Sequence, residues 1–123
     1  MKLAVGTADG RRLFAAHFGE SPEFLVIDLD LPGEAGHERR PNPWHAEPIA
    51  TRPPKIAALL ADCDAIAVRS IAKEGLETLS RRFTVLLAPG DEVAALLAAL
   101  ERDGVAALRR FDRERGKFVA GGD

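Results

Sequence analysis

The first third of the chain consists of short apolar runs separated by turn residues. Residues 2–6 and 24–29 have the apolar character of strands. Residues 12–16 follow an Asp9-Gly10 pair, a turn sequence typical of β-hairpins, and are predicted to form a strand as well. A weaker, polar strand is predicted near residues 36–40. The first three of these segments together predict an antiparallel three-stranded meander.

The pattern changes after residue 54. Apolar side chains then recur at the spacing of one helix face, at Ile56, Leu59, Leu60 and Cys63. Residues 65–68 and 83–87 are short, fully apolar runs, typical of strands that are buried on both faces. A second helix is predicted between them, with Ser70 as its N-cap, and a third from Asp91. Alternating strands and helices predict parallel strands with right-handed crossovers.

The two halves are joined by residues 41–54, which contain five of the eight prolines and are therefore expected to be an extended connection. The economical assembly is an α/β fold with a mixed five-stranded sheet and helices packed on it. An antiparallel meander followed by a parallel half is the order of elements of the ribonuclease H-like topology. Residues 111–119 could add a small hairpin or a docked tail, and Gly121-Gly122-Asp123 are expected to be disordered.

Composition narrows the class of protein. A chain of 123 residues with 46% hydrophobic and 29% charged residues is the size of one domain with a real core. Its net charge of -2 argues against a nucleic-acid partner. No apolar run is long enough for a membrane helix, and the chain enters a strand too early for a signal peptide. One cysteine excludes an internal disulfide, so we expect a soluble, cytoplasmic protein.

Chemistry concentrates in residues 17–24, between two predicted strands. His17 stands beside Phe18 and Gly19, and a histidine in such a loop can project into a cleft and bind a metal through one ring nitrogen. The alternative is a loop histidine that packs locally. His45, next to the only tryptophan, is a second candidate ligand or a lid residue, whereas His37 is expected to be exposed. The histidine spacing matches no zinc motif, so a structural zinc is not expected.

Cys63 allows two interpretations. A thiolate would suit a soft metal. Because Cys63 also continues the apolar helix face that begins at Ile56, a buried structural thiol is favoured.

The motifs taken together resemble the dinitrogenase iron-molybdenum cofactor biosynthesis family over about residues 1–100. The resemblance rests on residues 1–5, Asp9-Gly10, His17-Phe18-Gly19 with Ser21 and Phe24, Asp28, and residues 56–66 with their Asp-Cys-Asp corner. It implies a ribonuclease H-like domain over residues 1–103, with residues 104–123 as a partly disordered C-terminal extension.

The resemblance also implies a function. Such a domain would bind or carry an iron-molybdenum cluster, an iron-sulfur cluster or a precursor, and would exchange it with donor and acceptor proteins of metallocofactor assembly. His17 corresponds to the cluster ligand of the family, with Phe18, Gly19 and Ser21 around it. The oligomeric state is left open.

One segment departs from the family pattern. Where relatives have a glycine-rich turn, this chain has Arg69-Ser70-Ile71-Ala72-Lys73. The segment is either an ordinary helix start or a site adapted to an anionic ligand, with Arg69, Ser70 and Lys73 as its contacts. The departure also leaves open an interaction or regulatory module that no longer binds a cluster.

Catalysis is not expected. The first strand carries no carboxylate for two-metal nuclease chemistry. The sequence also has neither a nucleophile elbow nor a phosphate-binding loop.

Overall fold

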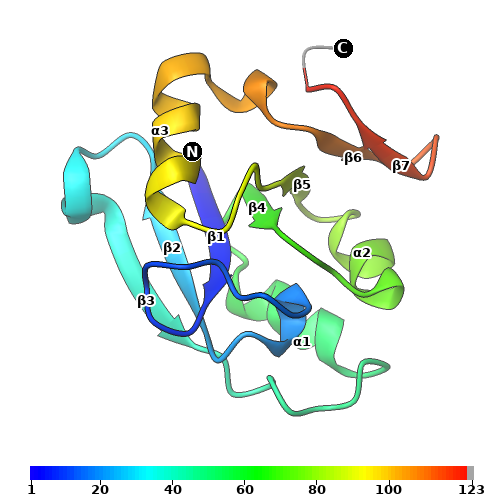
Figure 1. Cartoon of the computed structure of the whole chain (residues 1–123). Helices are drawn as coiled ribbons and strands as arrows, with labels where there is room; N and C mark the ends of the chain where they lie inside the picture. Colours follow the sequence, from blue (N-terminus) through cyan, green and yellow to red (C-terminus); the bar gives the residue numbers. More distant parts are fainter. Residues whose placement is uncertain (122–123) are drawn as a thin grey trace.

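A computed structural model describes residues 1–121, which form a mixed sheet covered by helices on both faces (Figure 1). Its strands are β1 (Lys2–Thr7), β2 (Glu23–Asp28), β3 (His37–Pro41), β4 (Ala65–Val68), β5 (Thr84–Leu87), β6 (Arg110–Asp112) and β7 (Lys117–Val119). Its helices are α1 (Arg52–Leu59), α2 (Lys73–Leu79) and α3 (Val93–Asp103). Short 3₁₀ turns are η1 (Phe18–Glu20), η2 (Gly33–Gly36) and η3 (Val105–Ala107).

The strand order is β3-β2-β1-β4-β5-β6-β7. Strands β1, β2 and β3 form an antiparallel meander, and β1, β4 and β5 run parallel. The predicted mixed sheet of an α/β fold is therefore confirmed. The predicted number of five strands is wrong, because the described part of the C-terminal segment adds the antiparallel hairpin β6-β7 beyond β5.

The predicted strand at residues 12–16 is also wrong. The turn predicted at Asp9-Gly10 does form. The Asp9 carboxylate accepts hydrogen bonds from the backbone N–H groups of Arg11 and Arg12, at 2.8 and 2.9 Å. The chain cannot return as a hairpin partner, because β1 already pairs with β2 on one side and β4 on the other. Residues Arg12 and Leu13 make isolated bridges instead. The third strand of the meander is the polar segment near residues 36–40.

The core has two layers, one on each face of the sheet. Alternating residues of β1, β2 and β4 point to opposite faces, as strand geometry requires. One face packs on α3 through Leu3, Val5, Leu25, Ile27, Ala65 and Ala67 with Val93, Leu96 and Leu100. The other packs on α1 and α2 through Ala4, Phe24, Val26, Ile66 and Val68 with Ile56, Leu60 and Leu79. In Figure 1, α1 and α2 accordingly lie together on one side and α3 on the other.

The second helix begins later than predicted. Helix α2 starts at Lys73, and its N-cap is Ala72, which makes no side-chain capping bond. Ser70 precedes the helix and contacts His17 instead. The prediction of Ser70 as N-cap is therefore wrong.

The C-terminal hairpin packs by its aromatic residues. Phe111 and Phe118 stand edge to face with ring centroids 5.5 Å apart, and both pack against the layer of α1 and α2. Gly116, at a φ of 68°, makes the turn. Of the residues predicted to be disordered, Gly122 and Asp123 lie outside the described part of the chain.

Candidate functional site

Three loops meet at one edge of the sheet. Because β1, β4 and β5 are parallel, the loops after them emerge at the same carboxyl edge, where α/β sheets commonly bind ligands. The loop after β1 is tied to the other two by backbone hydrogen bonds. The N–H of Phe18 donates to Ser70 O at 2.8 Å, and the N–H of Leu13 donates to Asp91 O at 2.9 Å.

His17 stands at this edge with an exposed side chain. Its Nδ1 lies 3.0 Å from Ser70 Oγ, within hydrogen-bond distance. Together with the Phe18–Ser70 backbone bond, this contact fixes the imidazole over the end of β4. Nε2 is the ring nitrogen that remains available to a ligand, since no hydrogen bond to it is found within residues 1–121. The structure thus brings together His17 and Ser70, which come from two separate predicted segments.

Ser21 and Gly6 hold the base of the loop. Ser21 is fully buried, and its hydroxyl donates to Phe18 O at 2.7 Å. A Cβ on Gly6 would lie 1.9 Å from Ser21 Oγ, so only glycine fits at this position. Ser21 therefore shapes the loop from within and does not face solvent.

Arg52 lies directly beneath the loop. The side chain is only 5% exposed, and a Cβ on Gly19 would come within 2.7 Å of Arg52 Nε. Its Nη1 donates to Glu47 O at 3.1 Å, whereas Nε is buried without a hydrogen-bond partner. No ion pair to Arg52 is found among residues 1–121, so a guanidinium without a carboxylate partner lies beneath the loop.

Asn42 joins the loop to the proline-rich connection. It is buried, and its amide donates to Gly19 O at 3.0 Å and to Ser21 O at 2.9 Å. Its Oδ1 accepts the backbone N–H of Trp44 at 3.0 Å. Neither Asn42 nor Arg52 was predicted from the sequence as a site residue. The one feature of the sequence that could have drawn attention to them is their position in the proline-rich connection, next to Pro43 and Pro53.

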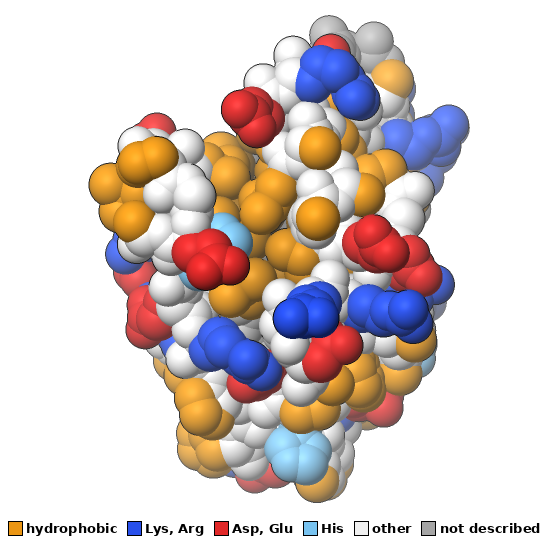
Figure 2. Space-filling model, turned by 60° about the vertical axis from the view of Figure 1, so that its left-hand side comes forward, with side chains coloured by type: hydrophobic (Ala, Val, Ile, Leu, Met, Phe, Trp, Pro, Cys, Tyr) orange, Lys and Arg blue, Asp and Glu red, His pale blue; other side chains and the backbone are white. Residues whose placement is uncertain are grey.

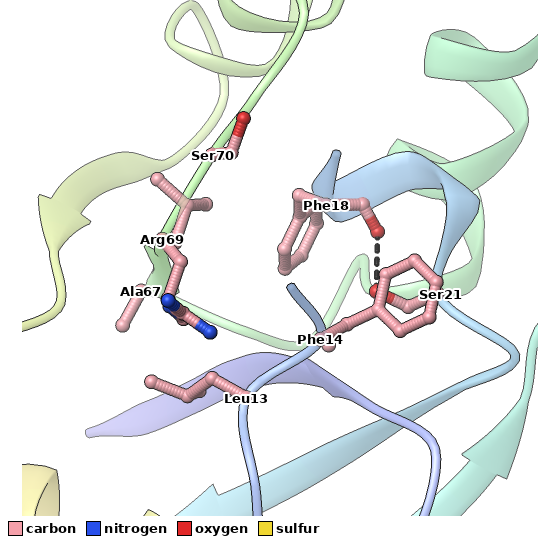
Figure 3. A pocket seen from close by; sticks show the side chains of 9 residues that line it. Leu13, Phe14, Phe18, Ser21, Ala67, Arg69 and Ser70 are labelled. Atoms are coloured by element: carbon pink, nitrogen blue, oxygen red, sulfur yellow. Dashed lines mark hydrogen bonds between the residues drawn. The ribbon is translucent and has the colours of Figure 1, made fainter. Parts of the chain in front are cut away.

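A shallow pocket opens between the loop and the end of β4 (Figure 3). Its volume is only about 10 Å³, the space of one water molecule, so a larger ligand would rest on the surface above it. The Phe18 ring and the Arg69 side chain face this space from opposite sides (Figure 3). Lys73 is exposed on the first turn of α2. Neither Arg69 nor Lys73 forms an ion pair within the described residues.

Cys63 is not near this pocket. Cys63 precedes β4 and Ser70 follows it, so the two residues lie at opposite ends of this strand. The predicted burial is confirmed, since Cys63 is 1% exposed in the layer of α1 and α2. Burial raises the pKa of the thiol to about 11, which keeps it protonated and unsuited to bind a metal.

His45 is exposed on the connection, and His37 is partly buried at the start of β3, not fully exposed as expected. The register places His37 opposite Ile27, near the amino end of β1 and away from His17. Within residues 1–121, no group of three or more His, Cys, Asp or Glu side chains is placed to hold a metal ion.

The sequence matches the model of the family described as dinitrogenase iron-molybdenum cofactor over residues 1–103, which is most of the chain. The chain belongs to the dinitrogenase iron-molybdenum cofactor family. The resemblance stated from the motifs is thereby confirmed. The match ends where α3 ends, so the β6-β7 hairpin lies beyond it.

Solved structures support the fold of this dinitrogenase iron-molybdenum cofactor family member. A crystal structure of a dinitrogenase candidate from Methanocaldococcus jannaschii aligns with a TM-score of 0.59 at 18% identity, covering 89% of this chain and 93% of that one. An NMR structure of a dinitrogenase candidate from Methanococcus jannaschii aligns with a TM-score of 0.62 at 20% identity, covering 88% and 90%. At this identity the likeness concerns the fold alone. No curated protein matches the sequence.

The helices of this family member are short. None of those in the described residues is both long and apolar enough to cross a membrane.

Proposed function

We propose that this protein carries an iron-molybdenum or iron-sulfur cluster, or a precursor, and holds it at the carboxyl edge of the sheet through His17. The observation that supports this most directly is the exposed imidazole, oriented by Ser70 beside a pocket lined by Phe18 and Arg69. With Nδ1 engaged by Ser70, Nε2 would be the atom that binds the metal.

The charges around His17 suit an anionic cargo. Arg69 and Lys73 are exposed cations without ion pairs in the described residues, and Arg52 is a buried one beneath the loop. An anion above the loop would be attracted by all three, and most strongly by Arg52, because a buried charge is less screened by water. Ser70, Phe18, Gly19 and Ser21 would orient the ligand and shape the surface on which the cargo rests.

A single protein ligand suits a carrier. A cluster held by one imidazole and by charge can be passed on without the protein unfolding, whereas four ligands would retain it. The proposal therefore includes donor and acceptor proteins of metallocofactor assembly as partners, a cytoplasmic location and no catalytic step. It excludes Cys63, whose protonated thiol lies at the other end of β4. His45 would be at most a secondary ligand.

We also propose that the core of the domain has the ribonuclease H-like fold. The five strands β3-β2-β1-β4-β5, a meander followed by a parallel half, support a ribonuclease H-like core to which the β6-β7 hairpin is added.

The test is anaerobic reconstitution of the full chain with a cluster donor, followed by visible absorption and metal analysis. Wild type should acquire a chromophore, and His17→Ala should lose it while keeping its far-UV circular dichroism. His37→Ala is the matched control, since His37 lies at the opposite end of β1 and should leave the chromophore unchanged. His45→Ala, tested alongside, measures any secondary contribution.

The charges are tested separately by Arg69→Ala combined with Lys73→Ala. Cluster uptake by this variant should be weaker and less sensitive to salt than that of wild type. If wild type takes up no cluster under conditions where a relative does, the carrier proposal fails. The chain would then be better described as an interaction module of the same fold.

A further inference from the structure

A second surface lies at the other end of the sheet from His17. It is a groove between the β2–β3 turn and the C-terminal half of α3, and we call it the α3 groove. Its lining residues are Ile27, Asp28, Leu29, Asp30, Leu31, Pro32, Gly33, Glu34, His37, Leu97, Leu100 and Glu101. The register of β1 and β2 places Ile27 beside Leu3, whereas Thr7 at the carboxyl edge pairs with Glu23.

The floor of the α3 groove is apolar. Ile27 and Leu100 are buried there, while Leu29 and Leu97 are partly buried. Leu31 is 49% exposed and is the one large hydrophobic side chain found exposed in residues 1–121. The groove has a volume of about 620 Å³, enough for several side chains of a partner. Figure 2 shows hydrophobic side chains gathered in a hollow on this face.

The rim of the α3 groove is acidic. Asp28, Asp30, Glu34 and Glu101 line it, and no lysine or arginine is among the lining residues. Asp30 pairs with the terminal amine at 2.7 Å, but Glu34 and Glu101 form no ion pair within the described part of the chain. In Figure 2, acidic side chains stand beside the hollow, and the basic side chains of this face lie farther away, above and below it. A ligand of this surface must offer apolar groups together with positive charge.

We propose that the α3 groove binds a basic amphipathic helix of a partner protein. In such a helix, apolar residues at positions i, i+3, i+4 and i+7 would contact Leu29, Leu31 and Leu97. Flanking lysines and arginines would reach the carboxylates of Glu34 and Glu101. The bound helix would lie beside α3 on the same face of the sheet. The proposal is independent of His17, which is at the other edge.

The test uses a fluorescent synthetic peptide of about 18 residues, five helical turns, composed of leucine and lysine at this spacing. Fluorescence anisotropy with the full chain should show micromolar binding at low salt that weakens as salt increases. The same peptide with glutamate in place of lysine should not bind. Leu31→Ser, at an exposed position, should weaken binding without altering circular dichroism.

Charge reversal separates the groove from general electrostatics. Glu34→Lys combined with Glu101→Lys should weaken binding at least about tenfold. The matched control, Glu74→Lys combined with Glu114→Lys, makes the same change in net charge on α2 and the β6-β7 turn and should retain binding. Three results would overturn the proposal: no binding of the lysine peptide, equal loss in both double variants, or a dimer of wild type that Leu31→Ser dissociates.

Discussion

Replacing Asn42 gives the strongest single test of which contacts hold the loop that carries His17. The Asn42 side chain is 2% exposed and uses both amide hydrogens and the amide oxygen, in hydrogen bonds of 2.9 to 3.0 Å. Two of these bonds hold the loop that carries His17, and the third holds the backbone of Trp44. Asn42→Ala removes all three and leaves two carbonyl groups and one N–H without their partner.

The expected magnitude follows from this count. Each hydrogen bond contributes about 1 kcal/mol to stability, so the loss of three should lower the free energy of unfolding by about 3 kcal/mol. A domain of this size should still fold, with a melting temperature lower by roughly 10 °C. Asn42→Asp should be at least as unstable as Asn42→Ala, because it would place carboxylate oxygens against the carbonyls of Gly19 and Ser21.

The assay is equilibrium unfolding in urea, followed by far-UV circular dichroism and by the fluorescence of Trp44, the only tryptophan. Circular dichroism reports global unfolding, whereas the fluorescence reports the segment that Asn42 holds. Thr51→Ala is the matched control, since it removes an exposed hydrogen bond of 3.2 Å in the same connection and should cost less than about 0.5 kcal/mol.

A loss below about 0.5 kcal/mol for Asn42→Ala, equal to that of Thr51→Ala, would refute this account of the loop. A fluorescence transition well before the dichroism transition would show that Asn42 stabilises the connection alone. The three bonds would then not be part of the cooperative unit.

Three further predictions concern other parts of the molecule. Gly6→Ala should destabilise the fold by more than about 2 kcal/mol, since its Cβ would lie 1.9 Å from Ser21 Oγ, and a second change, Ser21→Gly, should restore part of the loss in melting temperature. Cys63 should react with a thiol reagent at pH 8 at least about a hundredfold more slowly in native than in urea-unfolded protein, because burial raises its pKa to about 11; equal rates would contradict this. Hydrogen bonds from Arg40 hold the pKa of Asp62 below its usual value, so the stability this carboxylate contributes is present above about pH 4 and is lost as the pH falls. Asp62→Asn should therefore flatten the acid decline of the urea midpoint.

Elements with a strong local pattern could be predicted from the sequence. β4 and β5 are short apolar runs, a pattern that predicts buried strands. The buried residues of α3 lie on one stripe, a pattern that predicts an amphipathic helix. The strand expected at residues 12–16 failed for a non-local reason, because both edges of β1 are occupied by strands that come later in the chain. The position of the β6-β7 hairpin in the sheet could not be predicted either, because the sequence of a hairpin does not indicate which other strand it will pair with.

The candidate site shows the same limit. His17 and Ser70 are 53 residues apart, and no periodicity relates them. The family resemblance drew attention to both segments without indicating that they touch. The roles of Asn42 and Arg52 could not be predicted from the sequence. Each contacts, through its side chain, a loop that is more than twenty residues away in sequence. Only packing brings such pairs together.

The site therefore divides into two kinds of residue. Asn42, Ser21 and Gly6 are buried, and their contacts fix the backbone of the loop before any ligand arrives. His17 and Arg69 are exposed, and they need not break an ion pair within the described residues to meet a ligand. Binding at such a surface would order little of the protein, so little conformational entropy would be lost on binding or regained on release. A protein that stored a cluster would need the reverse, a buried ligand set that closes around its cargo, and the separation of Cys63 from His17 excludes that arrangement for this pair.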